Sequence, residues 1–316
     1  MLTLDQITAA AGRAAPYVAR TPVVDLRDGR LLKLESLQPT GSFKVRGFFA
    51  AALALPADRL QRGLLTVSAG NAAQAAAYVA HTLGLACRVF MLDTAPAAKV
   101  NGVRRWGATP VLVPRPELMA WMDQAGWEHE PETFIHPFAD DEVIAGHGGI
   151  GLELLEQTDR LERIFVAVGG GGLISGVASA IRAAGRAIEI VGVQSEGYPL
   201  WPRVLEAGGP VSVTPNTIAD GTTAPFNPAM FVRLRELVDR WVLVPEASVR
   251  AAIRELATTV KVVVEGAGAL GYAALKLEPP GSASAAIVSG GNIDLTLLCD
   301  ILAENPDAAT SARSTA

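Results

Sequence analysis

Short apolar runs rich in β-branched residues alternate along this chain with longer alanine-rich stretches of helical period. The clearest runs cover residues 64–67, 163–168, 188–193 and 285–288. This alternation predicts an α/β fold with a parallel sheet and helices on both of its faces. Two of the runs lead directly into a tight turn and a helix-forming segment, at residues 68–71 and 169–172. Ligands bind at the carboxyl ends of parallel strands, so these two turns are the first candidates for chemistry.

Length and composition exclude several classes of protein. A chain of 316 residues is long enough for about two domains. Its formal net charge of −5 provides no basic surface, so we expect no nucleic-acid partner. Cys87 and Cys299 form no CxxC pair, and the chain shows neither a signal-peptide pattern nor an apolar stretch of about 18 residues. We therefore expect a cytoplasmic protein that does not enter a membrane.

Four consecutive glycines follow the run 163–168 and open a helix-forming segment. They are Gly169, Gly170, Gly171 and Gly172, and Leu173 comes next. Unshielded backbone amides at a helix N-terminus converge on an anion, most naturally a phosphate. The alternative is a flexible turn, but four glycines cost backbone entropy that a plain turn does not need. The GxGxxG and GxxxxGK[ST] patterns of nucleotide sites are absent, which makes a nucleotide the weaker option.

A lysine provides the second clue. Lys44 lies among small residues and an aromatic in the segment 40–47. Most lysines are solvated surface residues, so Lys44 alone indicates little. In an apolar pocket, however, a lysine has a lowered pKa and can form a Schiff base with an aldehyde. An aldehyde cofactor that also carries a phosphate is pyridoxal phosphate.

Four motifs occur in an order that is typical of one family. They cover residues 42–47, 68–71, 169–173 and 289–292. In these motifs the chain resembles the serine/threonine dehydratases of the tryptophan synthase β-like, fold type II, pyridoxal-phosphate enzymes. The resemblance extends from about Thr21 to Asp294. It implies two lobes, each an open and mostly parallel sheet flanked by helices.

The resemblance also implies a division of the chain. Residues 1–51 and 139–316 are expected to form a large domain that binds pyridoxal phosphate. Residues 52–138 contain enough strand and helix signals for a small domain that closes over the active site. A homodimer is expected, since dimers are usual among the enzymes that the chain resembles.

Individual residues receive roles from the same resemblance. Lys44 is implied to carry the cofactor and to remove the α-proton of the substrate, while Phe43 packs on the pyridine ring. Asn71 is implied to bind the 3′-oxygen, and Ser289 to face the ring nitrogen. The four glycines and Leu173 are implied to hold the phosphate. The residues implied to receive the substrate carboxylate are Ser68, Ala69, Gly70 and Asn71.

The activity implied is β-elimination from a small β-hydroxy amino acid such as L-threonine or L-serine, which yields a 2-keto acid and ammonia. A hydroxyl at Ser289 leaves the ring nitrogen largely unprotonated, and this favours elimination over transamination. Alternatives are a dehydratase for 3-hydroxyaspartate, phenylserine or a similar amino acid, and a serine or aspartate racemase. Racemases of the family carry a second serine where this chain has Ala69. A non-catalytic amino-acid binding protein and an NAD-dependent oxidoreductase are the remaining alternatives.

Several positions depart from the family pattern. Ala72 stands where relatives usually have His, and Gly266 where they usually have Pro. The divalent-cation site of the racemase-like branch would fall around Gln194, Tyr198 and Leu200, and no carboxylate stands in the expected places. We therefore expect no metal.

Overall fold

The computed structural model describes residues 1–279 and 283–304. It contains a six-stranded sheet in the order β1-β2-β10-β7-β8-β9, parallel except for the antiparallel pair β1 and β2. The strands are β1 (Val23–Asp25), β2 (Arg30–Leu34), β7 (Arg163–Ala167), β8 (Glu189–Ser195), β9 (Arg240–Val244) and β10 (Ser284–Val288). Three of the predicted apolar runs are therefore strands of one sheet.

The second sheet is four-stranded and wholly parallel, in the order β5-β4-β3-β6. Its strands are β3 (Leu64–Val67), β4 (Cys87–Leu92), β5 (Thr109–Val113) and β6 (Thr133–Phe134). All four lie within the segment predicted as a small domain, and β3 coincides with the predicted run. The two mostly parallel sheets confirm the predicted fold class. The domain boundaries at residues 52 and 138 stay a prediction.

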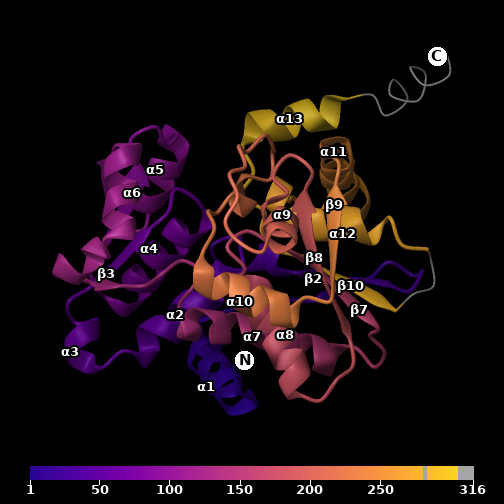
Figure 1. The fold of residues 1–316 in the computed structure, drawn as a ribbon, viewed down its shortest axis with the longest axis horizontal. Helices are drawn as coiled ribbons and strands as arrows, with labels where there is room; N and C mark the ends of the chain where they lie inside the picture. Colours follow the sequence, from indigo (N-terminus) through magenta and orange to yellow (C-terminus); the bar gives the residue numbers. More distant parts are fainter. Residues whose placement is uncertain (280–282, 305–316) are drawn as a thin grey trace.

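Helices cover both sheets. The α-helices are α1 (Leu4–Ala14), α2 (Lys44–Ala54), α3 (Ala57–Leu60), α4 (Asn71–Leu83), α5 (Ala97–Arg104), α6 (Arg115–Asp123), α7 (Asp141–Gln157), α8 (Gly172–Ala183), α9 (Leu200–Ala207), α10 (Pro228–Leu237), α11 (Glu246–Glu255), α12 (Gly266–Leu275) and α13 (Leu295–Ala303). Short helical turns are η1 (Ala15–Tyr17), η2 (Glu35–Leu37), η3 (Gly126–His129), η4 (Asp220–Thr222) and η5 (Leu256–Val260). Figure 1 shows α4, α5 and α6 around the smaller sheet on the left and α11, α12 and α13 on the right.

The core follows the two-residue period of the strands. In β7, Ile164 and Val166 pack with α1, α7, α8, α9 and α10 on one face of the larger sheet. Phe165 and Ala167 pack with α11, α12 and α13 on the other. Alternate side chains of a strand point to opposite faces, so an apolar run with no polar alternation is buried on both. Among the described residues, no helix is both long and apolar enough to cross a bilayer.

Candidate active site

Three helices begin at residues that the sequence analysis predicted to bind a ligand. α2 begins at Lys44, α4 at Asn71 and α8 at Gly172. The first turn of a helix leaves backbone N–H groups without intrahelical partners, and these groups carry partial positive charge. The structure thus places a helix N-terminus at both of the predicted turns, 68–71 and 169–172.

Ser289 is brought next to the Lys44 segment by an antiparallel bridge between Ser42 and Gly290. The backbone N–H of Phe43 donates a hydrogen bond to the Ser289 carbonyl oxygen at 3.1 Å. The Ser289 hydroxyl is buried and donates to the carbonyl oxygen of Ala267 at 3.3 Å. Two motifs from opposite ends of the sequence therefore form one wall of the site.

Lys44 is desolvated, and this lowers the pKa of its ammonium group to about 8. Its Nζ donates to the carbonyl oxygen of Pro137 at 2.7 Å and lies 5.1 Å from the centroid of the Phe43 ring. The neighbouring His136 accepts hydrogen bonds at Nδ1 from the backbone of Phe138 and Ala139, at 3.3 and 3.0 Å. Burial, with a smaller contribution from Lys44, lowers the pKa of His136 to about 4. A neutral imidazole therefore holds the turn that contacts the lysine.

The four-glycine turn is closely packed on its outer side. A Cβ atom at Gly170 would lie 2.3 Å from the Phe138 ring, and one at Gly172 would lie 2.7 Å from the Phe138 carbonyl oxygen. Gly171 adopts a φ of +93°, which side chains disfavour. In residues 1–279 and 283–304, no acceptor bonds the N–H of Gly169, Gly170 or Gly171. The turn therefore keeps free donors of the kind that a phosphate requires.

Two residues that the sequence did not mark as functional hydrogen-bond to the backbone at the start of this turn. Gln194 donates from Nε2 to the Val168 carbonyl oxygen at 2.9 Å and accepts from the Trp201 backbone at 2.8 Å. The Trp201 indole donates to the Gly169 carbonyl oxygen at 2.6 Å. Gln194 is thus a structural amide at the position where the racemase-like branch would have a cation ligand. Leu173 is buried in the core of the larger sheet.

The loop predicted to receive a carboxylate offers two amides. The N–H of Ser68 donates to the Phe90 carbonyl oxygen, and that of Gly70 donates to the Ser68 hydroxyl, both at 3.0 Å. Within the described part of the chain, the N–H groups of Ala69 and Asn71 have no acceptor. Ala72, where the resemblance expects His, lies in the first turn of α4 and is buried in the core that α2 and α4 share.

Asn71 lies in a polar network with Glu265. Its Nδ2 donates to Glu265 Oε1 at 2.5 Å. Burial raises the pKa of Glu265 to about 7, and the nearby Asp220 carboxylate adds to this rise. The hydrogen bond from Asn71 and the charge of Lys99 oppose it. A buried carboxyl group that titrates near neutrality therefore contacts the residue predicted to bind the 3′-oxygen.

Arg46, two residues after Lys44, has a role that sequence reasoning missed. Its guanidinium is buried and donates to both carboxylate oxygens of Glu35, at 2.8 and 2.9 Å, and of Glu153, at 2.7 and 2.9 Å. Such bidentate pairs impose a defined geometry. Because Arg46 lies in the first turn of α2, these bonds fix the start of the helix that carries Lys44. The only sequence signal for this role was that Arg46 lies in the same motif as Lys44, at residues 42–47.

The described residues fit pyridoxal phosphate. A desolvated lysine, a glycine turn with free N–H donors and a carboxamide donor match an aldehyde, a phosphate and a ring oxygen. Residues 1–279 and 283–304 contain no group of three or more His, Cys, Asp or Glu side chains that could hold a metal.

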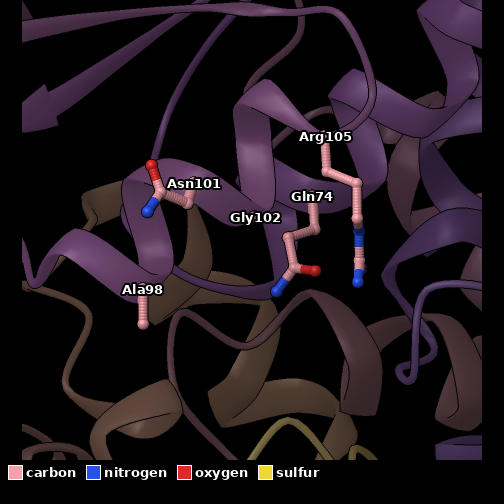
Figure 2. Close-up of a pocket in the computed structure, with 5 residues that line it drawn as sticks. All are labelled: Gln74, Ala98, Asn101, Gly102 and Arg105. Carbon is pink, nitrogen blue, oxygen red and sulfur yellow. The ribbon is translucent and has the colours of Figure 1, made fainter.

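A separate cavity of about 330 Å³ lies between α4 and α5 (Figure 2). Its lining residues are Gln74, Ala98, Asn101, Gly102 and Arg105. None of the residues predicted to bind cofactor or substrate lines it. The cavity is therefore distinct from the candidate active site.

Comparisons with known proteins identify the family. Residues 14–290 match the family model "Pyridoxal-phosphate dependent enzyme". The chain is 36% identical over 316 residues to an L-threonine ammonia-lyase of Thermotoga maritima, covering 96% of this chain and 78% of the relative. It is 41% identical over 271 residues to an L-threonine ammonia-lyase of Geobacter sulfurreducens, covering 83% and 67%.

Solved structures agree with this result. The crystal structure of a threonine deaminase from T.th. matches with a TM-score of 0.84 and 39% identity, covering 93% of this chain and 99% of that one. Maize serine racemase matches with a TM-score of 0.88 and 31% identity, covering 99% and 98%. The sequence motifs, the geometry of the site and these matches agree that this chain belongs to the family of pyridoxal-phosphate dependent enzymes.

Proposed function

We propose that this protein is an ammonia-lyase that dehydrates and deaminates L-threonine, and also L-serine, to a 2-keto acid and ammonia. The threonine ammonia-lyases and the threonine deaminase to which it is similar support this substrate class. The observation that carries the proposal is the desolvated Lys44, the first residue of α2. Among the described residues, its Nζ donates a hydrogen bond only to the Pro137 carbonyl oxygen.

Bound pyridoxal phosphate would supply an electron sink for the negative charge that develops at the α-carbon of the substrate. The amides of the four-glycine turn would hold its phosphate, and Asn71 would donate to its 3′-oxygen. The free N–H groups of Ala69 and Asn71 would bind the substrate carboxylate. With a pKa near 8, the amine of Lys44 is partly neutral at physiological pH and can accept the α-proton.

Ala69 favours elimination over racemisation in this proposal. Inversion of the α-carbon needs a proton carrier on each face of the planar carbon, and Lys44 serves only one face. A methyl group at Ala69 can neither give nor take a proton. Elimination needs no second carrier at this position, so the likeness to serine racemases does not by itself favour racemase activity.

We further propose that the protein acts in the cytoplasm as a homodimer, without a nucleic-acid partner. The two unpaired cysteines support the cytoplasmic location, and the net charge of −5 supports the absence of a nucleic-acid partner. The homodimer rests on the resemblance to enzymes that are usually dimers. We also propose that residues 52–138 close over the bound substrate as a small domain. The ion pair between Lys99 and Asp220, which links the smaller-sheet side of the molecule to the larger-sheet side, supports such closure.

The test is to incubate the purified protein, loaded with pyridoxal phosphate, with L-threonine, L-serine, 3-hydroxyaspartate and phenylserine. Release of 2-keto acid and ammonia in equal amounts, fastest from threonine, is the expected result. Faster release from 3-hydroxyaspartate or phenylserine would show that the proposed substrate is wrong. Formation of the D-amino acid without ammonia would show that the protein is a racemase and not a lyase.

A further inference from the structure

We propose that Asn292 is a positioning residue that orients the side-chain amide of Asn71, so that Asn71 presents an N–H group and not a carbonyl oxygen to the cofactor. The inference deepens the proposed function, because it rests on the proposed contact between Asn71 and the 3′-oxygen of pyridoxal phosphate. It concerns a residue that lies in the 289–292 motif but has no role assigned so far.

A backbone carbonyl sets the orientation of the Asn292 amide. Asn292 Nδ2 lies 2.8 Å from the Thr40 carbonyl oxygen, and the same nitrogen lies 2.8 Å from Asn71 Oδ1. A carbonyl oxygen can only accept a hydrogen bond, so the atom of Asn292 that faces Thr40 must be the nitrogen. Both hydrogens of this NH₂ group are then in use, one toward each partner.

The orientation passes from Asn292 to Asn71. Because the Asn292 nitrogen donates, the atom of Asn71 that faces it must be the acceptor, Oδ1. The Asn71 nitrogen then points toward Glu265, where it donates to Oε1 at 2.5 Å. One hydrogen of the Asn71 NH₂ group remains. It is the only donor that the Asn71 side chain can still offer to a ligand.

The backbone passes close to this chain of bonds at two glycines. A Cβ atom at Gly41, where φ is +71°, would lie 2.6 Å from Asn292 Oδ1. A Cβ atom at Gly290 would lie 2.4 Å from Glu265 Oε1 and 3.1 Å from Asn71 Nδ2. These two glycines are required by the amide network itself.

The same backbone is joined to the network by its own hydrogen bonds. The N–H of Gly291 donates to the Gly41 carbonyl oxygen at 2.8 Å, and the N–H of Glu265 donates to the Gly290 carbonyl oxygen at 3.1 Å. Segments that are far apart in the sequence are thereby held together. The position of the Asn292 segment relative to Glu265 and to the Gly41 turn is therefore defined by backbone contacts, and side-chain bonds join Asn71 to both Asn292 and Glu265.

The contacts of Asn292 are not those of a residue that serves only to stabilise the fold. The residue is exposed, so its side chain fills no core space. Its side-chain nitrogen bonds to the Thr40 carbonyl oxygen and to the Asn71 amide. These bonds determine which atom of each amide faces its partner, and they fill no space in the core. Loss of the Asn292 side chain should therefore change how Asn71 meets a ligand while leaving the fold intact.

The experiment is a double-mutant cycle on cofactor binding by the apoprotein, read from the dissociation constant of pyridoxal phosphate and the absorbance maximum of the bound form. Asn292→Ala is expected to weaken binding about ten-fold, the size of one lost hydrogen bond to a charged group, and to shift the maximum. Asn71→Ala should weaken binding at least as much. Adding Asn292→Ala to Asn71→Ala should have no further effect, because Asn292 acts only through Asn71.

Asp294→Ala is the matched control in the same loop. The Asp294 carboxylate caps α13 by accepting from the N–H groups of Thr296 and Leu297 and does not contact Asn71. It should lower thermal stability without changing cofactor affinity. Asn292→Asp is a second variant of nearly the same shape that cannot donate, and it should weaken cofactor binding at least as much as Asn292→Ala.

Unchanged affinity in both Asn292 variants would overturn the proposal. Equal losses from Asn292→Ala in the presence and absence of Asn71 would overturn it as well, because Asn292 would then act independently. These measurements use no substrate. Failure of the proposed lyase activity would therefore appear as a lack of keto acid even while the cycle behaves as expected.

Discussion

Lys99 in α5 and Asp220 in η4 form an ion pair with 2.5 Å between Nζ and Oδ2, and this pair joins the smaller-sheet side of the molecule to the larger-sheet side. The two side chains are 37% and 59% exposed, so solvent weakens their attraction. Exposed pairs of this kind contribute at most about 1 kcal/mol. The pair can therefore bias closure of the predicted small domain without locking it.

The first prediction concerns this pair. Lys99→Ala is expected to raise KM for the amino-acid substrate by no more than about five-fold, as its exposed position implies. High salt should produce a similar rise in the unmodified protein and none in the variant. The charge-swapped double variant, Lys99→Asp with Asp220→Lys, should recover most of the loss. A KM that changes neither in the Lys99 and Asp220 variants nor at high salt would contradict a role of this ion pair in closure.

Lys44 is the subject of the second prediction. Lys44→Ala should abolish covalent attachment of pyridoxal phosphate and its absorbance band, expected at about 410–420 nm. Lys261→Arg, at an exposed lysine, should keep the band. In the unmodified apoprotein, the rate of attachment should rise with pH and level off above about pH 8, because the neutral amine attacks the aldehyde. If Lys44→Ala still formed an adduct that borohydride reduces to a stable product, another lysine would be the one that carries the cofactor.

The third prediction separates phosphate binding from other contacts. Gly170→Ala places a Cβ atom 2.3 Å from the Phe138 ring, so the turn or the ring must move. Affinity for pyridoxal phosphate should fall about ten-fold or more, while affinity for pyridoxal, which lacks the phosphate, should stay nearly unchanged. Gly12→Ala, where no atom lies within 4 Å, is the matched control. Equal losses for both ligands would place the phosphate elsewhere.

The fourth prediction follows from the buried carboxyl group of Glu265, whose pKa rises from 4.5 to about 7 in the folded protein. The folded state holds this proton more tightly than the unfolded state, so the contribution of Glu265 to stability declines as pH rises from about 4.5 to 7 and is then constant. The loss at pH 8 is about 3 kcal/mol. Glu265→Gln should remove it, so urea unfolding of the apoprotein should show a gain over the parent at pH 8 and little gain at pH 4.5. An equal gain at both pH values would contradict the shifted pKa.

The fifth prediction concerns the ratio of two reactions. Ala69→Ser adds a hydroxyl where racemases of the family carry one, and a positioned acid or base contributes about 10²–10⁴-fold to a proton transfer. The ratio of D-serine to pyruvate formed from L-serine should therefore rise. Ala69→Val adds bulk without a proton carrier and should not raise it. Chiral chromatography measures both products, and a parent enzyme that already forms D-serine as fast as pyruvate would refute this prediction.

The sequence by itself was sufficient for the local parts of this protein. The runs at residues 64–67 and 163–168 predicted β3 and β7, and the glycines after residue 168 predicted the start of α8. These signals depend on strand periodicity and turn chemistry, which a short segment encodes alone. Because the motifs also occur in a family order, the cofactor could be inferred before any contact was known.

Only the tertiary structure decided which of these parts meet. Asn292 contacts Asn71 across 221 positions of sequence, and Arg46 contacts Glu153 across 107. Such contacts depend on β10 lying between β2 and β7, a strand order that no local pattern specifies. The raised pKa of Glu265 and the lowered pKa of Lys44 likewise arise from burial among distant segments. Desolvation is a property of the packed molecule, and for this reason the sequence could name these groups but not their protonation behaviour.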